Sequence, residues 1–356
     1  MTVRDWLDLL VVPLALVVIS FLFTTQQDQR QQRAETQRAK AEQELAEQRA
    51  QDEALQAYLD QMTVLMVQGG LYSSEKDSGL RTLAQARTLT LLQRLDPRRK
   101  TEVLQFLIEA NLVAGVGQKD PIISLHGAEL RGVNLSYTNL SGADLSEANL
   151  ADTQLLGIEL NDANLSNADL DGAHMTNAEL KGADLFEADL DGSLLISSNL
   201  NQADMSEATL HGANLSDAEL SDATWSFADL TGADLRGADL IGVTMRDVTL
   251  DGANLSNTDL TKAILTDSLF TNANVSGATL DDAVMLYTGY EYADLSGADL
   301  SNVNWSWSSA GGADLTGADL SNVNMRGTTG LPEAKLEKQT VSLKGATMPN
   351  GQKYED

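Results

Sequence analysis

An apolar residue recurs at every fifth position from Leu125 to Met325, and this period dominates the second half of the chain. The frame holds through 41 pentads without an insertion or a deletion, and 30 of the 41 central residues are leucine. The residue two positions before each centre is alanine in 26 pentads, and otherwise Ser, Thr, Val or Ile. Asp and Asn dominate the position between these two, as in Ala233-Asp234-Leu235. Each pentad thus has two inward positions and one polar position between them.

A period of five fits neither the 3.6-residue turn of an α-helix nor the two-residue alternation of a β-strand. It fits a chain that turns one corner every five residues, so that four sides close a square coil of 20 residues. Stacked coils then pair their backbones about 4.8 Å apart, as neighbouring strands do. The pattern predicts a β-solenoid of about ten coils, in which each coil buries its core only against its neighbours.

The repeated signature, Ala-(Asp/Asn)-Leu followed by two variable residues, resembles that of the pentapeptide-repeat proteins over about 205 residues. This resemblance implies a right-handed quadrilateral β-helix for residues 121–330. The ending over residues 345–351 and the order of the segments also resemble membrane-anchored cyanobacterial members of that family.

The N-terminal segment carries a second hydrophobic pattern, because residues 9–23 hold no charge at all. A helix over residues 6–23 would span about 27 Å, close to the hydrocarbon thickness of a bilayer. We therefore expect a single-pass transmembrane anchor over residues 1–25 that contacts the membrane through residues 6–25, with a soluble core helix as the alternative. The basic residues that follow the span predict a cytoplasmic C-terminal region: Arg30, Arg33, Arg38 and Lys40. The resemblance to cyanobacterial members implies that the membrane is the plasma or thylakoid membrane of a bacterium.

Residues 26–70 are rich in Gln, Glu, Arg and Ala and predict a long polar helical spacer. Two interpretations remain open for this spacer: self-association through residues 26–68 as a parallel coiled coil, or a stalk whose last turns dock on neighbouring helices. Residues 71–120 predict two short helices that cap the solenoid, and Asp96-Pro97 marks the boundary between them. Residues 331–356 form a C-terminal tail that we expect to close the other end.

The charge is concentrated in the repeat. The whole chain has 24 basic and 52 acidic residues, but residues 121–330 alone have 6 basic and 32 acidic residues, a net charge of −26. Such a surface cannot bind nucleic acid directly by neutralising phosphates, which requires Lys and Arg. There is no cysteine, there are three histidines, and the known nucleotide-binding and hydrolase motifs are missing. We predict a protein that is not an enzyme, with no catalytic residue, no cofactor and no metal site.

The 20-residue coil predicts which side chains become neighbours on adjacent coils. One outward column runs through Glu219, Asp239 and Asp259 and continues at Asp299 and Asp319, with Thr279 between. Repulsion between these carboxylates favours either a solvated acidic face or the binding of a divalent cation.

A second predicted column departs from this acidic pattern, because it runs through Thr224, Thr244, Ile264, Val284 and Asn304. Outward apolar and aromatic residues gather beside it, and an apolar patch on a charged protein indicates a contact surface. The candidate partner patch comprises Ile264, Val284, Leu286, Tyr287, Tyr292 and Trp307. The alternative is that Leu331, Leu336, Val341 and Leu343 of the tail cover this patch.

Two functions are consistent with these features. The first is a membrane-anchored, non-enzymatic scaffold that presents a rigid acidic β-solenoid to a protein partner of unknown identity. The second follows from the family resemblance, because some pentapeptide-repeat proteins imitate DNA and occupy the DNA site of type II topoisomerases such as gyrase. The predicted anchor favours the scaffold, since a DNA mimic must diffuse to the nucleoid.

Overall fold

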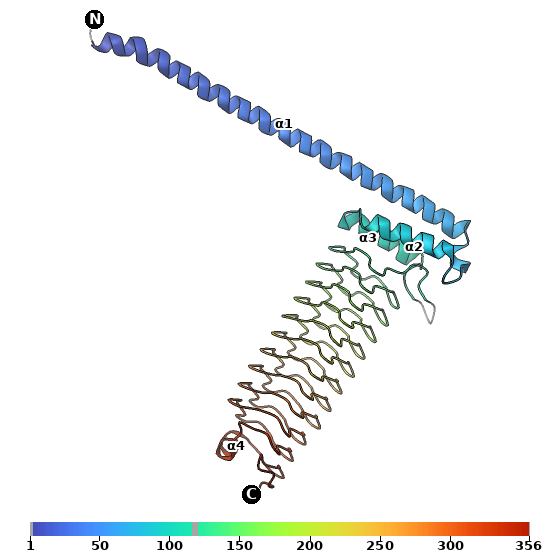
Figure 1. Cartoon of the computed structure of the whole chain (residues 1–356), viewed down its shortest axis with the longest axis vertical. Helices are drawn as coiled ribbons and strands as arrows, with labels where there is room; N and C mark the ends of the chain where they lie inside the picture. The colour runs from blue at the N-terminus through green and yellow to red at the C-terminus, as the bar shows by residue number, and fades with distance from the viewer. Residues whose placement is uncertain (1–2, 116–119, 356) are drawn as a thin grey trace. The chain divides into compact units, whose positions relative to one another are not determined.

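A computed structural model describes the backbone of residues 3–115 and 120–355, and the side chains of residues 3–5, 7–10, 12 and 28 lie outside the description. The chain divides into two compact units, Met1–Ala57 and Tyr58–Asp356. Its helices are α1 (Val3–Val67), a 3₁₀ helix (Leu71–Ser73), α2 (Gly79–Leu92), α3 (Pro97–Glu109) and α4 (Glu333–Gln339). Residues 121–330 form the stack of coils that follows α3 (Figure 1).

The predicted membrane anchor requires a correction. Residues 6–25 do not form a separate spanning helix, because α1 continues for 65 residues from the apolar stretch into the Gln-, Glu- and Arg-rich spacer, with Pro13 inside it. Within the described part of the chain, no helix combines the length and the apolarity needed to cross a membrane. The predicted single-pass topology and bacterial membrane location are therefore left without structural support.

The repeat forms the predicted four-sided coil with a period of 20 residues. The residue before each centre makes a parallel bridge with the residue 20 positions later, for example Glu219 with Asp239. Around Leu235, the amide of Asp234 donates to the carbonyl of Ala213 at 2.9 Å, and the amide of Leu235 donates to that of Asn254 at 2.7 Å. Each coil is therefore hydrogen-bonded to the coils before and after it.

Every corner of the solenoid is a turn with the same backbone geometry. At most corners the amide of the third residue after a centre donates to the carbonyl of that centre, as Ala128 does to Leu125 at 2.9 Å, whereas the amides of Val248 and Thr288 donate to the hydroxyls of Ser268 and Ser308. The second residue after the centre has a positive φ at all 41 corners, as the third residue of a type II turn does. Only 17 of these 41 residues are glycine, so most corners hold an L-residue in a left-handed conformation that costs roughly 1–2 kcal/mol.

Large side chains fill the axis of the solenoid. All central residues from Leu125 to Met325 are buried, and the bulkiest are Trp225, Phe270, Tyr290 and Trp305. The Phe270 and Tyr290 rings stack with centroids 4.5 Å apart, and Trp305 meets Tyr290 edge-on at 5.6 Å. Small Ala310 follows Tyr290 in the same column, which leaves room for these rings.

The Tyr290 hydroxyl is buried without a hydrogen-bond partner among the described residues, and burial raises the pKa of this phenol well above its usual value. Because an unpaired buried hydroxyl costs about 1–3 kcal/mol, we expect Tyr290→Phe to leave the free energy of unfolding unchanged or to raise it. Thermal unfolding followed by circular dichroism measures this change. A loss of more than about 1 kcal/mol would show that the hydroxyl has a partner, such as a trapped water molecule.

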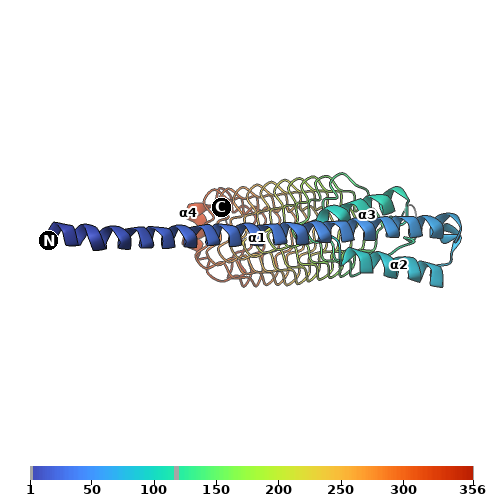
Figure 2. The same cartoon turned by 90° about the horizontal axis from the view of Figure 1, so that it is seen from above.

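Helices α2 and α3 lie at the N-terminal end of the coil stack, and α4 lies at the other end (Figure 1, Figure 2). Asp96 caps α3 by accepting a hydrogen bond from the Arg99 amide at 2.9 Å, as the Asp-Pro boundary predicts. The nearly buried Lys100 pairs with Glu129 of the first coil, with 3.6 Å between Nζ and Oε1. These helices therefore close the axis that the first coil would otherwise expose.

The last turns of α1 pack on the helical pair. Met62 is fully buried, and the hydroxyl groups of Tyr58 and Thr88 form a hydrogen bond of 2.7 Å. Burial, partly opposed by the hydrogen bond with Thr88, raises the pKa of Tyr58 to about 12. The end of the polar spacer thus docks on α2 instead of remaining exposed.

The C-terminal tail extends and closes the solenoid. After α4 the chain resumes the coil, and Ser342 and Thr347 bridge Asp319 and Asn324 with an offset of 23 residues instead of 20. Of the four tail residues predicted to pack, Leu331, Leu336 and Leu343 are buried, whereas Val341 is 69% exposed. The prediction for Val341 is wrong because this residue begins the resumed side and faces outward.

Candidate protein-interaction surface

Two adjoining sides of the solenoid lose their charge toward the C-terminus. On the first neutral face the outward ladder after Asp204 is Thr224, Thr244, Ile264, Val284, Asn304 and Asn324. On the second neutral face the ladder after Asp229 is Thr249, Leu269, Gly289, Ser309 and Thr329. The two faces meet at one corner, the neutral corner, whose turn residues recur every 20 positions from 226–227 to 326–327.

Five of the six predicted patch residues come together here. Ile264 and Val284 are successive rungs of the first neutral face, and both are half-buried. Leu286 and Tyr287 form the turn that follows Val284, and Trp307 is the next residue in the Tyr287 column. Tyr292 lies one corner further on, where it is 71% exposed.

The tail leaves the aromatic side chains uncovered. Tyr287 is 57% exposed and Trp307 is 54% exposed, although the tail is present and folded. Tail amides and carbonyls instead pair with the last coil, as the Met325 amide does with the carbonyl of Thr347 at 2.8 Å. The tail therefore closes the end of the solenoid, and the alternative that it covers the patch is wrong for these two rings.

The apolar residues of the first neutral face cost local stability. Elsewhere the Asp or Asn before a centre accepts a hydrogen bond from the amide two residues later, as Asn274 does from Ser276 at 3.0 Å and Asp294 from Ser296 at 2.9 Å. Ile264 and Val284 cannot accept this bond, which is worth about 1 kcal/mol. The apolar residues of the patch are therefore less stabilising at these positions than Asp or Asn would be.

Two of the three aromatic rings of the patch rest on glycines of the next coil, a feature that the pentad pattern did not reveal. A Cβ on Gly327 would collide with the Trp307 ring, and one on Gly312 would lie 2.5 Å from the Tyr292 ring. The same pairing occurs at the far end, where Gly157 lies beneath Tyr137. An aromatic residue at the second turn position with a glycine 20 residues later is the signal that identifies this packing.

The neutral corner also holds residues that the sequence pattern did not single out. Phe227 lies earlier in the Tyr287 column, and Leu269 is exposed on the second neutral face. Arg246 and Arg326 occupy the first turn position of the same corner, two coils to either side of Leu286. Applying the 20-residue register to all outward residues would have found them.

The acidic column has the predicted register, since Glu219, Asp239 and Asp259 are bridged in sequence. Within the described residues, no group of three or more potential ligands is placed to hold a metal ion. Asp171 shows the effect of crowding on another side, because desolvation and the neighbouring carboxylates, Asp189 first among them, raise its pKa.

His211 bridges two carboxylates on the acidic part of the rod. Its Nδ1 lies 2.8 Å from Asp191, and its Nε2 lies 3.2 Å from Asp229. The hydrogen bond to Asp191 is the main cause of the raised pKa of His211, which favours the imidazolium form. In its imidazolium form the ring links neighbouring coils electrostatically.

One serine–histidine contact invites comparison with a hydrolase. Ser146 Oγ lies 2.9 Å from His126 Nδ1, and His126 Nε2 lies 3.9 Å from Glu147. However, the Ser146 hydroxyl donates its hydrogen to Asp144 Oδ1 at 2.6 Å, so it is not poised to lose a proton to the imidazole. Both His126 and Glu147 are exposed to solvent on a corner of the rod.

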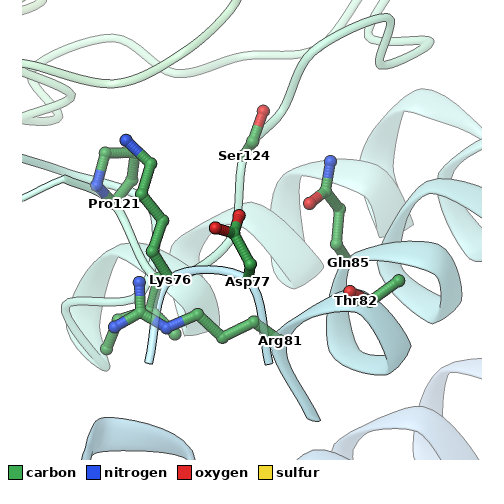
Figure 3. A pocket seen from close by; sticks show the side chains of 8 residues that line it. Lys76, Asp77, Arg81, Thr82, Gln85, Pro121 and Ser124 are labelled. Atoms are coloured by element: carbon green, nitrogen blue, oxygen red, sulfur yellow. The ribbon is translucent and has the colours of Figure 1, made fainter. Parts of the chain in front are cut away.

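A pocket of about 270 Å³ lies between the N-terminal helical pair and the first coil (Figure 3). Lys76, Asp77, Arg81 and Gln85 line it, together with Thr82, Pro121, Ile122 and Ser124. Lys76 Nζ is paired with Asp120 at 2.8 Å, and Arg81 Nε donates to the Ser74 hydroxyl at 3.2 Å. The cations of this pocket are therefore already engaged within the chain.

Comparisons with known proteins agree with this architecture. The sequence matches the model of the family described as Pentapeptide repeats in eight copies between residues 123 and 328. No curated protein matches the sequence. Among solved structures, the chain is similar to HetL, a pentapeptide repeat protein involved in heterocyst differentiation regulation from the cyanobacterium Nostoc sp. strain PCC 7120. The identity is 33%, over 65% of this chain and 90% of HetL, with a TM-score of 0.31.

Two further solved structures have a lower sequence identity to this chain. The plasmid-mediated fluoroquinolone resistance protein QnrB1 is 20% identical, over 51% of this chain and 89% of QnrB1, with a TM-score of 0.40. A pentapeptide repeat protein of the Arabidopsis thaliana thylakoid lumen is 30% identical, over 41% of this chain and 70% of that protein, with a TM-score of 0.15. The pentad frame, the 20-residue coil and the family match together establish that this chain belongs to the pentapeptide repeat family.

Proposed function

We propose that this protein is a non-enzymatic scaffold that binds a protein partner through the neutral corner and the first neutral face. The observation that carries this proposal is the cluster of Ile264, Val284, Leu286, Tyr287 and Trp307 on a rod that is otherwise strongly acidic. These residues remain exposed or half-buried after the chain has folded and closed its own ends.

The composition of the cluster matches the centre of a protein interface. Trp and Tyr are the residues most enriched among those that dominate binding energy, and interface centres are depleted of charge. The cluster also carries stability costs, because Tyr287 and Trp307 adopt positive φ and two rungs lack the Asp or Asn hydrogen bond. A function in binding explains why such costs are tolerated.

The acidic sides of the rod support a second candidate, a DNA mimic that inhibits a type II topoisomerase. The column of Glu219, Asp239 and Asp259 places carboxylates on successive coils, as phosphates follow one another along a duplex. The two functions would use different surfaces, because a DNA mimic relies on the acidic columns and not on Tyr287 and Trp307.

Affinity capture with the full-length chain from an extract of its own cells tests the scaffold proposal. The test variant is Tyr287→Ser/Trp307→Ser, and the matched control is Tyr137→Ser, which removes a ring from the same turn position, 75% exposed and likewise above a glycine. We expect a partner that binds the wild type and the control but is lost from the double variant.

Circular dichroism must show that all three proteins have the same solenoid content. Retention of every partner by the double variant, or equal loss from the control, would overturn the assignment of this surface. Inhibition of DNA supercoiling by gyrase that is undiminished in the double variant would support the DNA mimic instead.

A further inference from the structure

The side chains around the first neutral face change from negatively to positively charged toward the C-terminal end of the solenoid. From residue 283 to residue 350, this face and the turns that follow on its two flanking corners include no Asp or Glu, whereas Asp281 and Asp282 occupy the corner just before Val284 and Asp267 lies one coil before Tyr287. Over the same stretch the two corners carry Arg326 and Lys344, on opposite sides of the ladder of Asn304, Asn324 and Thr347. A chain with a net charge of −28 thus carries cations and no carboxylates on the last coils of this surface.

The cations of this surface are not neutralised within the chain. Neither Arg326 nor Lys344 forms an ion pair or a side-chain hydrogen bond among the described residues, and both are exposed. Arg131 and Arg236, in contrast, pair with Asp152 and Asp234. The C-terminal cations are therefore free to pair with groups outside the chain.

Arg326 lies close to the aromatic cluster along the axis of the solenoid. Arg326 follows Trp307 by one coil and Tyr287 by two on the neutral corner, so it lies within about 10 Å of both turns along the axis. An extended segment of three or four residues covers this distance at about 3.3 Å per residue. One short segment can thus contact the rings and Arg326 together, and a longer segment that crosses the face reaches Lys344.

On the basis of the proposed function, we infer that the partner contributes an acidic segment whose apolar side chain packs on Tyr287 and Trp307 and whose carboxylates pair with Arg326 and Lys344. Arginine binds carboxylates through two parallel hydrogen bonds, which also orient the segment. The acidic remainder of the rod repels the same segment, so this surface gains specificity from the repulsion as well as from the attraction.

Panning a phage-displayed library of random peptides on the immobilised full-length chain tests this inference without the natural partner. Each peptide is about 12 residues long, a length that spans several coils when extended. Peptides that elute from the wild type but not from Tyr287→Ser/Trp307→Ser are sequenced. We expect their ratio of Asp and Glu to Lys and Arg to exceed that of the input library at least threefold. We also expect their affinity, measured by fluorescence anisotropy, to fall as NaCl is raised.

Charge reversal provides the matched comparison. Arg326→Glu/Lys344→Glu should weaken the selected peptides at least fivefold, whereas Lys181→Glu, which reverses an exposed and unpaired cation elsewhere on the described part of the rod, should leave their affinity unchanged. Peptides that depend on the rings but are rich in Lys and Arg would overturn this inference and leave the proposed function standing. Failure to recover any ring-dependent peptide would count against both.

Discussion

Replacing Leu235 with Asp should break the solenoid in the middle. Leu235 is fully buried on the axis, and the residues above and below it in the same column, Leu215 and Leu255, provide no partner for a carboxylate. The substitution removes apolar packing worth about 2–5 kcal/mol and adds the desolvation of an unpaired charge. Because each coil depends on its neighbours, we expect the coils on the two sides to unfold as separate units, with a first transition roughly 10 °C or more below that of the wild type.

Thermal unfolding followed by circular dichroism, together with hydrogen exchange, detects this separation. The matched control is Asp234→Asn, for which we expect a change within about 1 kcal/mol. The side-chain oxygen of Asp234 accepts a hydrogen bond from the Arg236 amide at 3.3 Å, and an Asn oxygen can accept the same bond. A cooperative transition at the wild-type temperature in Leu235→Asp would contradict the inward assignment of the pentad centres.

The expected small effect of Asp234→Asn on the free energy of unfolding does not follow simply from the exposure of Asp234 to water. The Arg236 guanidinium pairs with Asp234 at 2.7 Å and, by this hydrogen bond, holds the pKa of the carboxyl below its usual value. That ion pair lies at the surface and contributes at most about 1 kcal/mol. Asp234→Ala removes the hydrogen bond to the turn as well and should be the less stable of the two variants.

Replacing Gly330 with Ala should detach the C-terminal tail. Gly330 has a φ of +80°, and a Cβ there would lie 2.5 Å from the Gly311 nitrogen and 2.6 Å from its Cα. Both atoms belong to backbone and cannot rotate away, so the chain after residue 330 must shift. We expect a local loss of about 3 kcal/mol or more and release of Leu331, Leu336 and Leu343 from the end of the axis.

Limited proteolysis and hydrogen exchange over residues 331–356 measure this release. Gly252→Ala is the matched control, because Gly252 also has a positive φ, +68°, but a Cβ added to it would have no atom of the described chain within 4 Å. The control should cost only the roughly 1–2 kcal/mol of a left-handed L-residue and should leave the tail protected. Equal protection of the tail in both variants would show that the end of the solenoid accommodates the added methyl group.

The period of the repeat was sufficient to predict the coil, its register and most of the candidate surface. Since 41 pentads follow one another without an insertion, counting by 20 brings Ile264 beside Val284 and Tyr287 beside Trp307. Little long-range information is needed, because most side chains of the repeat meet residues of their own coil or of the adjacent coils. The same regularity explains why the fold implied by the family resemblance agrees with the observed solenoid.

Hydropathy was a weaker guide at the N-terminus. Residues 6–25 are apolar in sequence, but the structure shows them as the first part of α1, which runs on into the polar spacer. A pattern of side chains along one segment does not determine where a helix ends, because helix continuation depends on the residues that follow. The corrected boundary of this element thus came from the three-dimensional structure.

The pentad pattern also determined which positions point inward, because two apolar residues in every five can be buried only on the axis of a square coil. The structure alone decided how the corners are completed: Asp and Asn bond the turn amides, and Trp307 rests on Gly327. It also decided that the tail closes the last coil and leaves Tyr287 and Trp307 exposed. The physical reason is that burial follows from the local period, whereas ring direction, hydrogen-bond partners and the path of a non-repeating tail depend on contacts between coils.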